Sequence, residues 1–356
     1  MKAVTVVPGR KGTLQLRDLS VPTPGQGQLL LKVKRVGVCG TDMDIIAGFY
    51  GEAQKGWDFL VLGHESLSTV EESGPGVEGF EKGDLVVPTV RRACPENCLN
   101  CRSAESDMCV TGHYSEHGIK GLNGFASEFA ITDSGYVVKL PSSLAEHGVL
   151  LEPLTIVEKG VRQTYVMQNA RMKWEPRRAI VLGSGPVGLL AAAVLRLRGL
   201  QVDTVARKPE DSLKARLASS MGARYIDATQ TPISSLGSEY DLVLECTGSA
   251  QVALEAQGLV NVNGVVSYVG IYDSKMATED AGKVFSNLVL GNRLQFGSVN
   301  ANISYFRKGV DDLVTMAKTW NGLLGRFITN VVPVGRAAEA YSPRGEDQVK
   351  TIIDFR

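Results

Sequence analysis

Four cysteines lie close together between residues 94 and 109. They are Cys94, Cys98, Cys101 and Cys109, spaced C-x3-C-x2-C-x7-C, in a segment that also contains Pro95. Four thiolates at such short spacing can complete a tetrahedron around Zn²⁺, which leaves no open position and makes the site structural. The alternative is a set of four free or redox-active thiols. The spacing therefore predicts a structural zinc site in a loop-like lobe.

A second set of metal-ligand residues is dispersed along the first part of the chain. Cys39 follows a strand-like apolar run, and His64 and Glu65 end another. A catalytic zinc takes about three protein ligands and keeps one position open, and thiolate, imidazole and carboxylate are all suitable donors. Spacing alone does not distinguish this set from a histidine and a glutamate with ordinary structural roles. These residues are therefore candidate ligands that need further context.

A glycine-rich turn follows the strand-like run at residues 179–182 and leads into an apolar helix. The turn reads Gly183-Ser184-Gly185-Pro186-Val187-Gly188. In a dinucleotide site the first glycine permits the tight turn, the second lets the pyrophosphate approach, and the third lets helix and strand pack closely. The helix N-terminus also attracts phosphate. We therefore predict that these six residues bind a dinucleotide.

The end of the next predicted strand indicates which dinucleotide binds. An NAD site usually has an acidic residue about 20 positions beyond the glycines, but this chain has Ala206 there, followed by Arg207 and Lys208. Two cations suit the 2′-phosphate of NADP, although a solvated basic loop would read the same way. We predict NADP as the preferred cofactor, with NAD as a second, usable one.

The motifs lie in two regions whose predicted secondary structures differ. The first 150 residues contain short strand-like runs between glycine and proline turns, which is typical of a barrel-like all-β domain. These runs are at residues 29–36, 59–62, 84–87, 124–131 and 136–140. A helix at 155–167, beginning near Pro153, marks the change.

From residue 178 strands alternate with helices, which indicates a parallel sheet covered on both faces. The predicted strands are 179–182, 201–206, 241–245, 262–269 and 294–298, and the helices are 186–197, 213–221, 251–259 and 281–290. After a helix that ends near Trp320, runs at 327–332 and 351–355 resemble the first region again. We expect this tail to close onto the first domain.

Composition narrows the class of protein. The chain has 356 residues, about twice the length of one typical domain, and 38 basic residues balance 38 acidic ones. Such a chain has no bias toward nucleic acid or a membrane surface. It begins without the apolar core of a signal peptide, and its six cysteines suit zinc better than disulfides. We expect a cytoplasmic protein that binds a small molecule, with no nucleic-acid or membrane partner.

Taken in order, the motifs resemble the zinc-containing medium-chain alcohol dehydrogenases. The shared segments are residues 37–42 (GVCGTD), 62–65 (LGHE), the four-cysteine lobe, 151–154 (LEPL) and the glycine-rich turn. Within that superfamily the chain is most similar to archaeal-type glucose 1-dehydrogenases, through residues 86–92 (VVPTVRR), 115–119 (SEHGI), 152–159 (EPLTIVEK) and 297–300 (GSVN). The lobe departs from the family in having three residues, not two, between Cys94 and Cys98.

The resemblance implies a role for each of the dispersed residues. Cys39 and His64 would be direct ligands of a catalytic zinc, Glu65 would bind or orient the zinc, and Glu152 would be a ligand or face the substrate. Thr41 would begin a proton relay and contact the substrate.

Two more residues are implied as contacts of the sugar. Glu116 and Asn300 would hydrogen-bond its hydroxyls, although Glu116 could be a surface carboxylate and Asn300 a helix cap. Asn300, Thr247 and Ser298 are also candidates for cofactor binding, together with the glycine-rich turn, Arg207 and Lys208.

The implied fold is α/β: a GroES-like β-barrel catalytic domain of residues 1–154 and 303–356, and a Rossmann domain of residues 155–302. The implied reaction is oxidation of D-glucose, and related aldoses, at C1 to the lactone, with two zinc ions per chain and a homodimer or homotetramer. The alternatives are a polyol or L-threonine dehydrogenase with the same zinc set, and a non-enzymatic cofactor-binding structural or stress protein. The latter typically lacks the catalytic zinc ligands.

Overall fold

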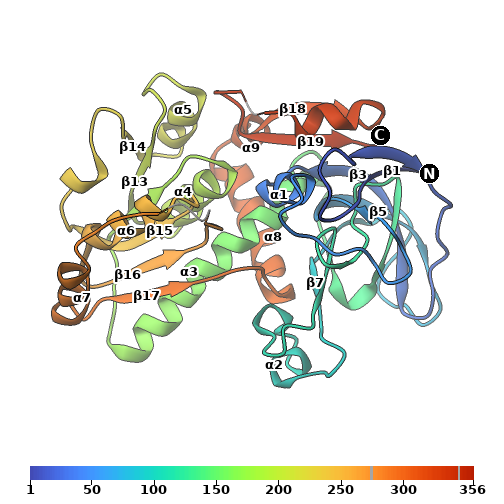
Figure 1. The fold of residues 1–356 in the computed structure, drawn as a ribbon, viewed down its shortest axis with the longest axis horizontal. Coiled ribbons are helices and arrows are strands. Elements are labelled where there is room, and N and C mark those ends of the chain that lie inside the picture. Colours follow the sequence, from blue (N-terminus) through green and yellow to red (C-terminus); the bar gives the residue numbers. More distant parts are fainter. Residues whose placement is uncertain (273–275, 344) are drawn as a thin grey trace. The chain divides into compact units, whose positions relative to one another are not determined.

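The computed structural model describes residues 1–272, 276–343 and 345–356, and its chain divides into two units (Figure 1). The first unit consists of Met1–Glu152, Asn300–Val314 and Ile328–Arg356, and the second of Pro153–Val299 and Thr315–Phe327. Both ends of the chain therefore belong to the first unit. Residues 315–327 cluster with the second unit, whereas the family resemblance implies residues 303–356 as part of the first domain.

The largest sheet of the first unit is built around β3 (Gln28–Gly37). Its strand order is β11-β6-β5-β3-β19-β18, and β10 also pairs with β3. The C-terminal strand β19 (Lys350–Asp354) runs antiparallel to the end of β3, with Ile352 opposite Gly37 (Figure 1). This pairing brings the last residues of the chain beside the first strands.

Apart from β5, the remaining strands of this unit are short, as the glycine and proline spacing predicts. They are β1 (Lys2–Val6), β2 (Gln15–Asp18), β4 (Leu60–Val61), β5 (Glu65–Ser73), β6 (Leu85–Pro88), β7 (Arg91–Arg92), β8 (Ser115–His117), β9 (Gly121–Leu122), β10 (Phe129–Asp133), β11 (Val137–Lys139) and β18 (Ile328–Pro333). The helices between them are α1 (Gly40–Ile46), α2 (Leu99–Arg102), η1 (Ser106–Met108), η2 (Ser134–Tyr136), η3 (Ser142–Leu144), η4 (Gly148–Leu150) and η6 (Val334–Tyr341).

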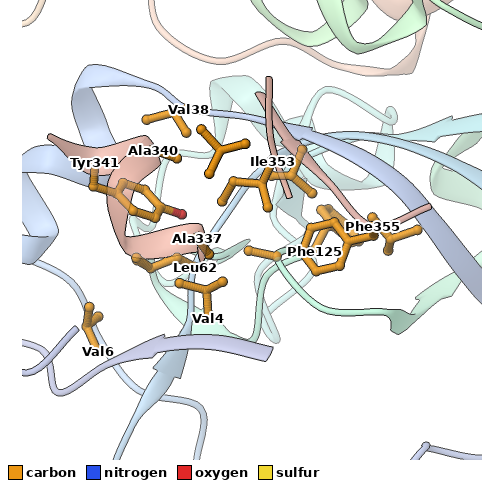
Figure 2. Packing of buried hydrophobic residues seen from close by; sticks show 14 of the residues in the cluster. Val4, Val6, Val38, Leu62, Phe125, Ala337, Ala340, Tyr341, Ile353 and Phe355 are labelled. Atoms are coloured by element: carbon orange, nitrogen blue, oxygen red, sulfur yellow. The ribbon is translucent and has the colours of Figure 1, made fainter. Parts of the chain in front are cut away.

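One apolar core joins the two ends of the chain within this unit. Val4 and Leu62 pack in the same cluster as Ile353 and Phe355, and Phe125 lies among them (Figure 2). Because burial of apolar surface drives folding, the C-terminal strand contributes to the same core as the N-terminal strands.

The second unit contains a six-stranded parallel sheet in the order β14-β13-β12-β15-β16-β17. The first strand, β12, is central: β13 and β14 lie on one side of it, and β15, β16 and β17 lie on the other. The direction of strand addition therefore reverses between β12 and β15, as in doubly wound dinucleotide-binding sheets. Its strands are β12 (Arg178–Leu182), β13 (Gln201–Ala206), β14 (Arg224–Asp227), β15 (Tyr240–Glu245), β16 (Val260–Tyr268) and β17 (Leu294–Gly297). Its helices are α4 (Pro186–Leu197), α5 (Leu213–Ser220), η5 (Ile233–Ser235), α6 (Ala250–Leu259), α7 (Ala281–Leu290) and α9 (Leu323–Phe327). The predicted alternation of strands and helices is confirmed, with β14 as an additional strand that the sequence pattern did not predict.

Two helices contain residues of both units. One is α3 (Leu151–Arg171), which begins two residues before the predicted start near Pro153 and places Pro153 in the first turn, where a missing N–H breaks no helical bond. The other is α8 (Ile303–Thr319). Within residues 1–272, 276–343 and 345–356, no helix has the length and apolar character needed to cross a membrane.

Candidate active site

Cys39, His64 and Glu65 come together in the first unit. Their ligand atoms all lie within 4.8 Å of one another, and His64 and Glu65 are buried. The pairing of two strands brings these residues close together, since Gly37 at the end of β3 pairs with Glu65 at the start of β5. The strand pair thus delivers a thiol, an imidazole and a carboxylate from two separate segments to one point.

Asp42 connects two of these residues from the first turn of α1. One oxygen of its buried carboxylate accepts a hydrogen bond from Cys39 N at 2.9 Å, and the other lies 3.5 Å from His64 Nδ1. A carboxylate at Nδ1 favours the proton on that nitrogen and leaves Nε2 free to bind a metal. Asp42 therefore orients His64 and fixes the backbone at Cys39.

The electrostatics of the cluster favour a cation. Burial alone would lower the pKa of His64, but the Asp42 carboxylate and the Cys39 sulfur raise it well above its usual range. The same negative groups would stabilise a divalent ion, and a sulfur, a nitrogen and a carboxylate oxygen are the donors that Zn²⁺ takes. The residues therefore fit a zinc ion.

Lys350 enters the cluster from β19. Its ammonium group forms an ion pair with Glu65 and donates a hydrogen bond to Val38 O at 3.1 Å, and both side chains of the ion pair are only 2% exposed. A Cβ on Gly37 would lie 2.0 Å from Glu65 Oε2 and 2.8 Å from Lys350 Cε. Only glycine at this position leaves room for the pair.

Glu152 is buried near the cluster but outside the group of close ligand atoms. Its pKa is raised to about 7, first by burial and then by the carboxylates of Glu65 and Asp42, while His64 and Lys350 lower it. Glu152 is therefore close enough to interact electrostatically with the predicted ligands. Thr41 also faces the cluster, with Oγ1 3.8 Å from Cys39 Sγ.

The two predicted sugar contacts bond to each other. Asn300 Nδ2 donates to Glu116 Oε1 at 2.9 Å, although 184 residues separate them in sequence. Two residues after Glu116, a Cβ on Gly118 would lie 2.5 Å from Gly63 O, so this strand end packs on the residue before His64. Helix α8 is capped by Asn302, whose Oδ1 accepts from Ser304 N at 3.0 Å, and not by Asn300.

The four lobe cysteines also converge, with sulfur atoms within 4.8 Å of one another. Backbone N–H groups of Cys101 and Val110 lower the pKa of Cys98 to about 6, whereas burial raises that of Cys101 to about 12. The donor set is four sulfurs, which fits a closed zinc site. The additional residue between Cys94 and Cys98 is accommodated by a turn in which Asn97 has a left-handed φ of 49°.

In the second unit the glycine-rich turn follows β12. Gly183 has a left-handed φ of 111°, and a Cβ on Gly188 would lie 2.0 Å from Gly183 O, so packing requires both glycines. A Cβ on Gly185 would meet no atom within 4 Å. Packing therefore does not explain Gly185, at the N-cap of α4, and open space there suits an approaching phosphate. Ser184, Pro186 and Val187 complete this turn.

The turn meets the end of β15 at the point where the strand order reverses. A Cβ on Gly183 would lie 3.2 Å from Thr247 Cγ2. Thr247 itself is held by the buried Glu245, whose Oε1 accepts from Thr247 N at 2.7 Å. Ser298 follows β17, and its N donates to Tyr268 O at 2.9 Å. These residues lie at the carboxyl ends of the strands, where doubly wound sheets bind ligands.

Strand β13 ends at Ala206, and Arg207 beyond it is exposed, while Lys208 is half-buried. Asp203, the nearest acidic residue of the strand, is bonded elsewhere: it accepts from Arg224 Nε at 3.0 Å and from Tyr240 OH at 2.6 Å. The two residues that follow the strand are thus cations.

Comparison with known proteins agrees with this geometry. The family described as "Glucose dehydrogenase C-terminus" matches residues 145–355, and "Alcohol dehydrogenase GroES-like domain" matches residues 25–142. The chain is 46% identical over 356 residues to glucose 1-dehydrogenase of Thermoproteus tenax, covering 100% of both chains. It is 44% identical to glucose 1-dehydrogenase 2 of Vulcanisaeta moutnovskia, covering 100% of this chain and 99% of the relative.

A solved structure is similar over the same length. It is Haloferax mediterranei glucose dehydrogenase in complex with NADP, Zn and gluconolactone. The TM-score is 0.91 at 32% identity, and the match covers 100% of this chain and 99% of that one.

Proposed function

Because this chain belongs to the glucose dehydrogenase family of the medium-chain alcohol dehydrogenases, we propose that it oxidises D-glucose, and related aldoses, at C1 to the lactone with NADP as acceptor. The observation that carries the proposal lies in the first unit, which holds both the Cys39–His64–Glu65 cluster and the Glu116–Asn300 pair. The cluster offers metal donors, and the pair offers groups that can hydrogen-bond sugar hydroxyls.

Cys39 and His64 would hold the catalytic zinc, with Glu65 and Glu152 as the carboxylates that bind it or face the substrate. When bound, zinc acts as a Lewis acid toward the C1 hydroxyl and NADP accepts the hydride from C1. Thr41, whose hydroxyl lies beside Cys39 Sγ, would take up the C1 hydroxyl proton and pass it toward solvent. Lys350 would balance the charge of Glu65 throughout.

Glu116 and Asn300 would select the sugar. A carboxylate accepts and an amide both donates and accepts hydrogen bonds, so a substrate lacking the matching hydroxyl would leave a buried polar group unpaired. This requirement favours a polyhydroxylated substrate over a simple alcohol.

The second unit would bind the cofactor. The glycine-rich turn and the N-terminus of α4 would receive the pyrophosphate, and Arg207 and Lys208 would pair with the 2′-phosphate of NADP. Thr247, Ser298 and Asn300 complete the proposed cofactor contacts. The four lobe cysteines would bind a second, structural zinc.

The test is a panel of D-glucose, D-galactose, D-xylose, sorbitol and L-threonine, each measured as kcat/KM with NADP and with NAD. We expect D-glucose with NADP to give the largest value. A preference for sorbitol or threonine would contradict the proposed substrate, and a preference for NAD would contradict the proposed acceptor and the proposed role of Arg207 and Lys208. A stoichiometry of two zinc ions per chain is expected, and His64→Ala should abolish turnover while NADPH binding remains.

We also propose a homodimer or homotetramer in the cytoplasm. Strand β17 is at the edge of its sheet, and α7 exposes Phe285, Val289 and Leu290 by 64%, 73% and 80%. Exposed apolar side chains beside an open sheet edge favour association with a second copy. Light scattering should give the mass of two or four chains, and Val289→Glu should lower it. None of the six cysteines forms a disulfide, which suits a reducing compartment.

A further inference from the structure

Arg91 in β7 is the antiparallel partner of Glu116 in β8. Its side chain is only 6% exposed, and its Nε donates to Glu116 Oε1 at 3.0 Å. Nη1 of the same guanidinium donates to Asp107 O at 3.1 Å, and the group lies 3.6 Å from the ring centroid of Tyr114. The guanidinium is therefore held by two acceptors and an aromatic face.

The two oxygens of Glu116 have different surroundings. Oε1 accepts from both Arg91 and Asn300, whereas Oε2 has no hydrogen-bond partner in the part of the chain that the structure describes. The side chain is 11% exposed. One oxygen is thus anchored, which leaves the other able to accept a hydrogen bond from a ligand.

The other acceptor of Arg91 is also fixed. Asp107 belongs to the cysteine lobe, lying between Cys101 and Cys109, and its Oδ1 accepts from Asn302 Nδ2 at 2.9 Å. The lobe backbone therefore supports Arg91, and Arg91 supports Glu116. A planar guanidinium can serve both acceptors at once, which a lysine ammonium at this position would not reproduce.

We propose that Arg91 is a positioning residue, which anchors Glu116 Oε1 so that Oε2 accepts a hydrogen bond from a hydroxyl of the sugar. This rests on the proposed function, because it takes an aldose as the ligand of Glu116. Loss of Arg91 leaves Oε1 held by Asn300 alone, so Glu116 can turn more easily. Sugar binding then weakens, whereas cofactor and zinc binding are unchanged.

The test compares Arg91→Lys and Arg91→Gln with Arg92→Lys. Arg92 is the matched control, since it is a buried arginine of the same strand that bonds to Thr89 and Thr132 and contacts neither Glu116 nor Asn300. We expect KM for D-glucose to rise about tenfold in Arg91→Lys and further in Arg91→Gln, the range typical for a lost charge-assisted hydrogen bond. KM for NADP and the zinc content should stay at the wild-type values in these variants, and Arg92→Lys should keep the wild-type KM for D-glucose.

A double-mutant cycle separates positioning from a general loss of structure. If Arg91 acts through Glu116, Arg91→Gln should scarcely change KM in a Glu116→Gln background. The inference would be overturned if the KM increases of Arg91→Gln and Glu116→Gln multiplied in the double variant. It would also be overturned by equal rises in KM for D-glucose and NADP, or by an unchanged KM for D-glucose in Arg91→Lys. If Arg91→Gln does not fold, the same double-mutant cycle with Arg91→Lys and Glu116→Gln tests the inference. Absence of glucose turnover in the wild type would contradict the proposed function itself, and this inference with it.

Discussion

Asp42 bridges Cys39 and His64: one carboxylate oxygen accepts from Cys39 N at 2.9 Å and the other lies 3.5 Å from His64 Nδ1. Asp42→Asn keeps the shape but removes the charge that orients the imidazole. We expect zinc affinity at this site to fall about 10- to 100-fold, as for other carboxylate partners of metal-binding histidines. Titration against a chelator measures it. The control is Asp44→Asn, two residues further along α1, and equal zinc affinity of Asp42→Asn and wild type would refute the role.

Gly37 provides the space in which Glu65 and Lys350 meet. Gly37→Ala would overlap the Glu65 carboxylate, so we expect the pair to separate and the catalytic zinc to be lost on dialysis. The zinc content should fall from two ions to one per chain, and kcat should fall with it. Gly40→Ala is a matched control, since a Cβ there meets no atom within 4 Å. Retention of two zinc ions by Gly37→Ala would show that the space is not needed.

Much of the fold and the members of the candidate metal site could be predicted from sequence. The strand–helix alternation and the glycine-rich turn are local patterns, and the structure confirms the parallel sheet that they predict. The family resemblance is likewise confirmed. Cys39, His64 and Glu65 lie within short motifs, and these motifs bring them together because β3 and β5 pair beside them.

Other parts of the site had no local signal. Lys350 reaches Glu65 only through the pairing of β19 with β3, and no motif around residue 350 marks it. Arg91 lies in a segment that carries the family resemblance, but its contact with Glu116 depends on the register of β7 and β8. The sequence places Asp42 three residues after Cys39, but only the fold shows that its carboxylate faces His64. The contacts that the sequence pattern did not predict thus depend on how strands far apart in the chain pair in the sheets.

Arg207 and Lys208 follow β13 where an NAD site usually has a carboxylate. We expect Arg207→Ala combined with Lys208→Ala to raise KM for NADP about 10- to 100-fold, since two charge-assisted hydrogen bonds to phosphate are lost. KM for NAD should change little. Lys173→Ala, which removes an exposed charge in the same unit, is the control. Equal effects on both cofactors would contradict a role specific to the 2′-phosphate.

His117 should make stability depend on pH. It is buried, its ring stacks on Phe125 with 4.6 Å between centroids, and Nδ1 lies 2.7 Å from Asn123 O. Burial, and then the charge of Arg92, lower its pKa to about 3. The unfolded chain binds a proton near pH 6.5 whereas the folded chain does not, so this contribution is complete above pH 6.5 and is lost as pH falls toward 3.

At pH 5 the loss should amount to about 2 kcal/mol of unfolding free energy. His117→Gln cannot titrate, so the difference in unfolding free energy between wild type and this variant should shrink by that amount from pH 7.5 to pH 5. Urea unfolding at the two pH values measures it, and other titrating groups cancel in the difference. His113→Gln is the control because its side chain is 68% exposed. A difference for His117→Gln that is the same at both pH values would show that the folded protein protonates His117 as readily as the unfolded chain.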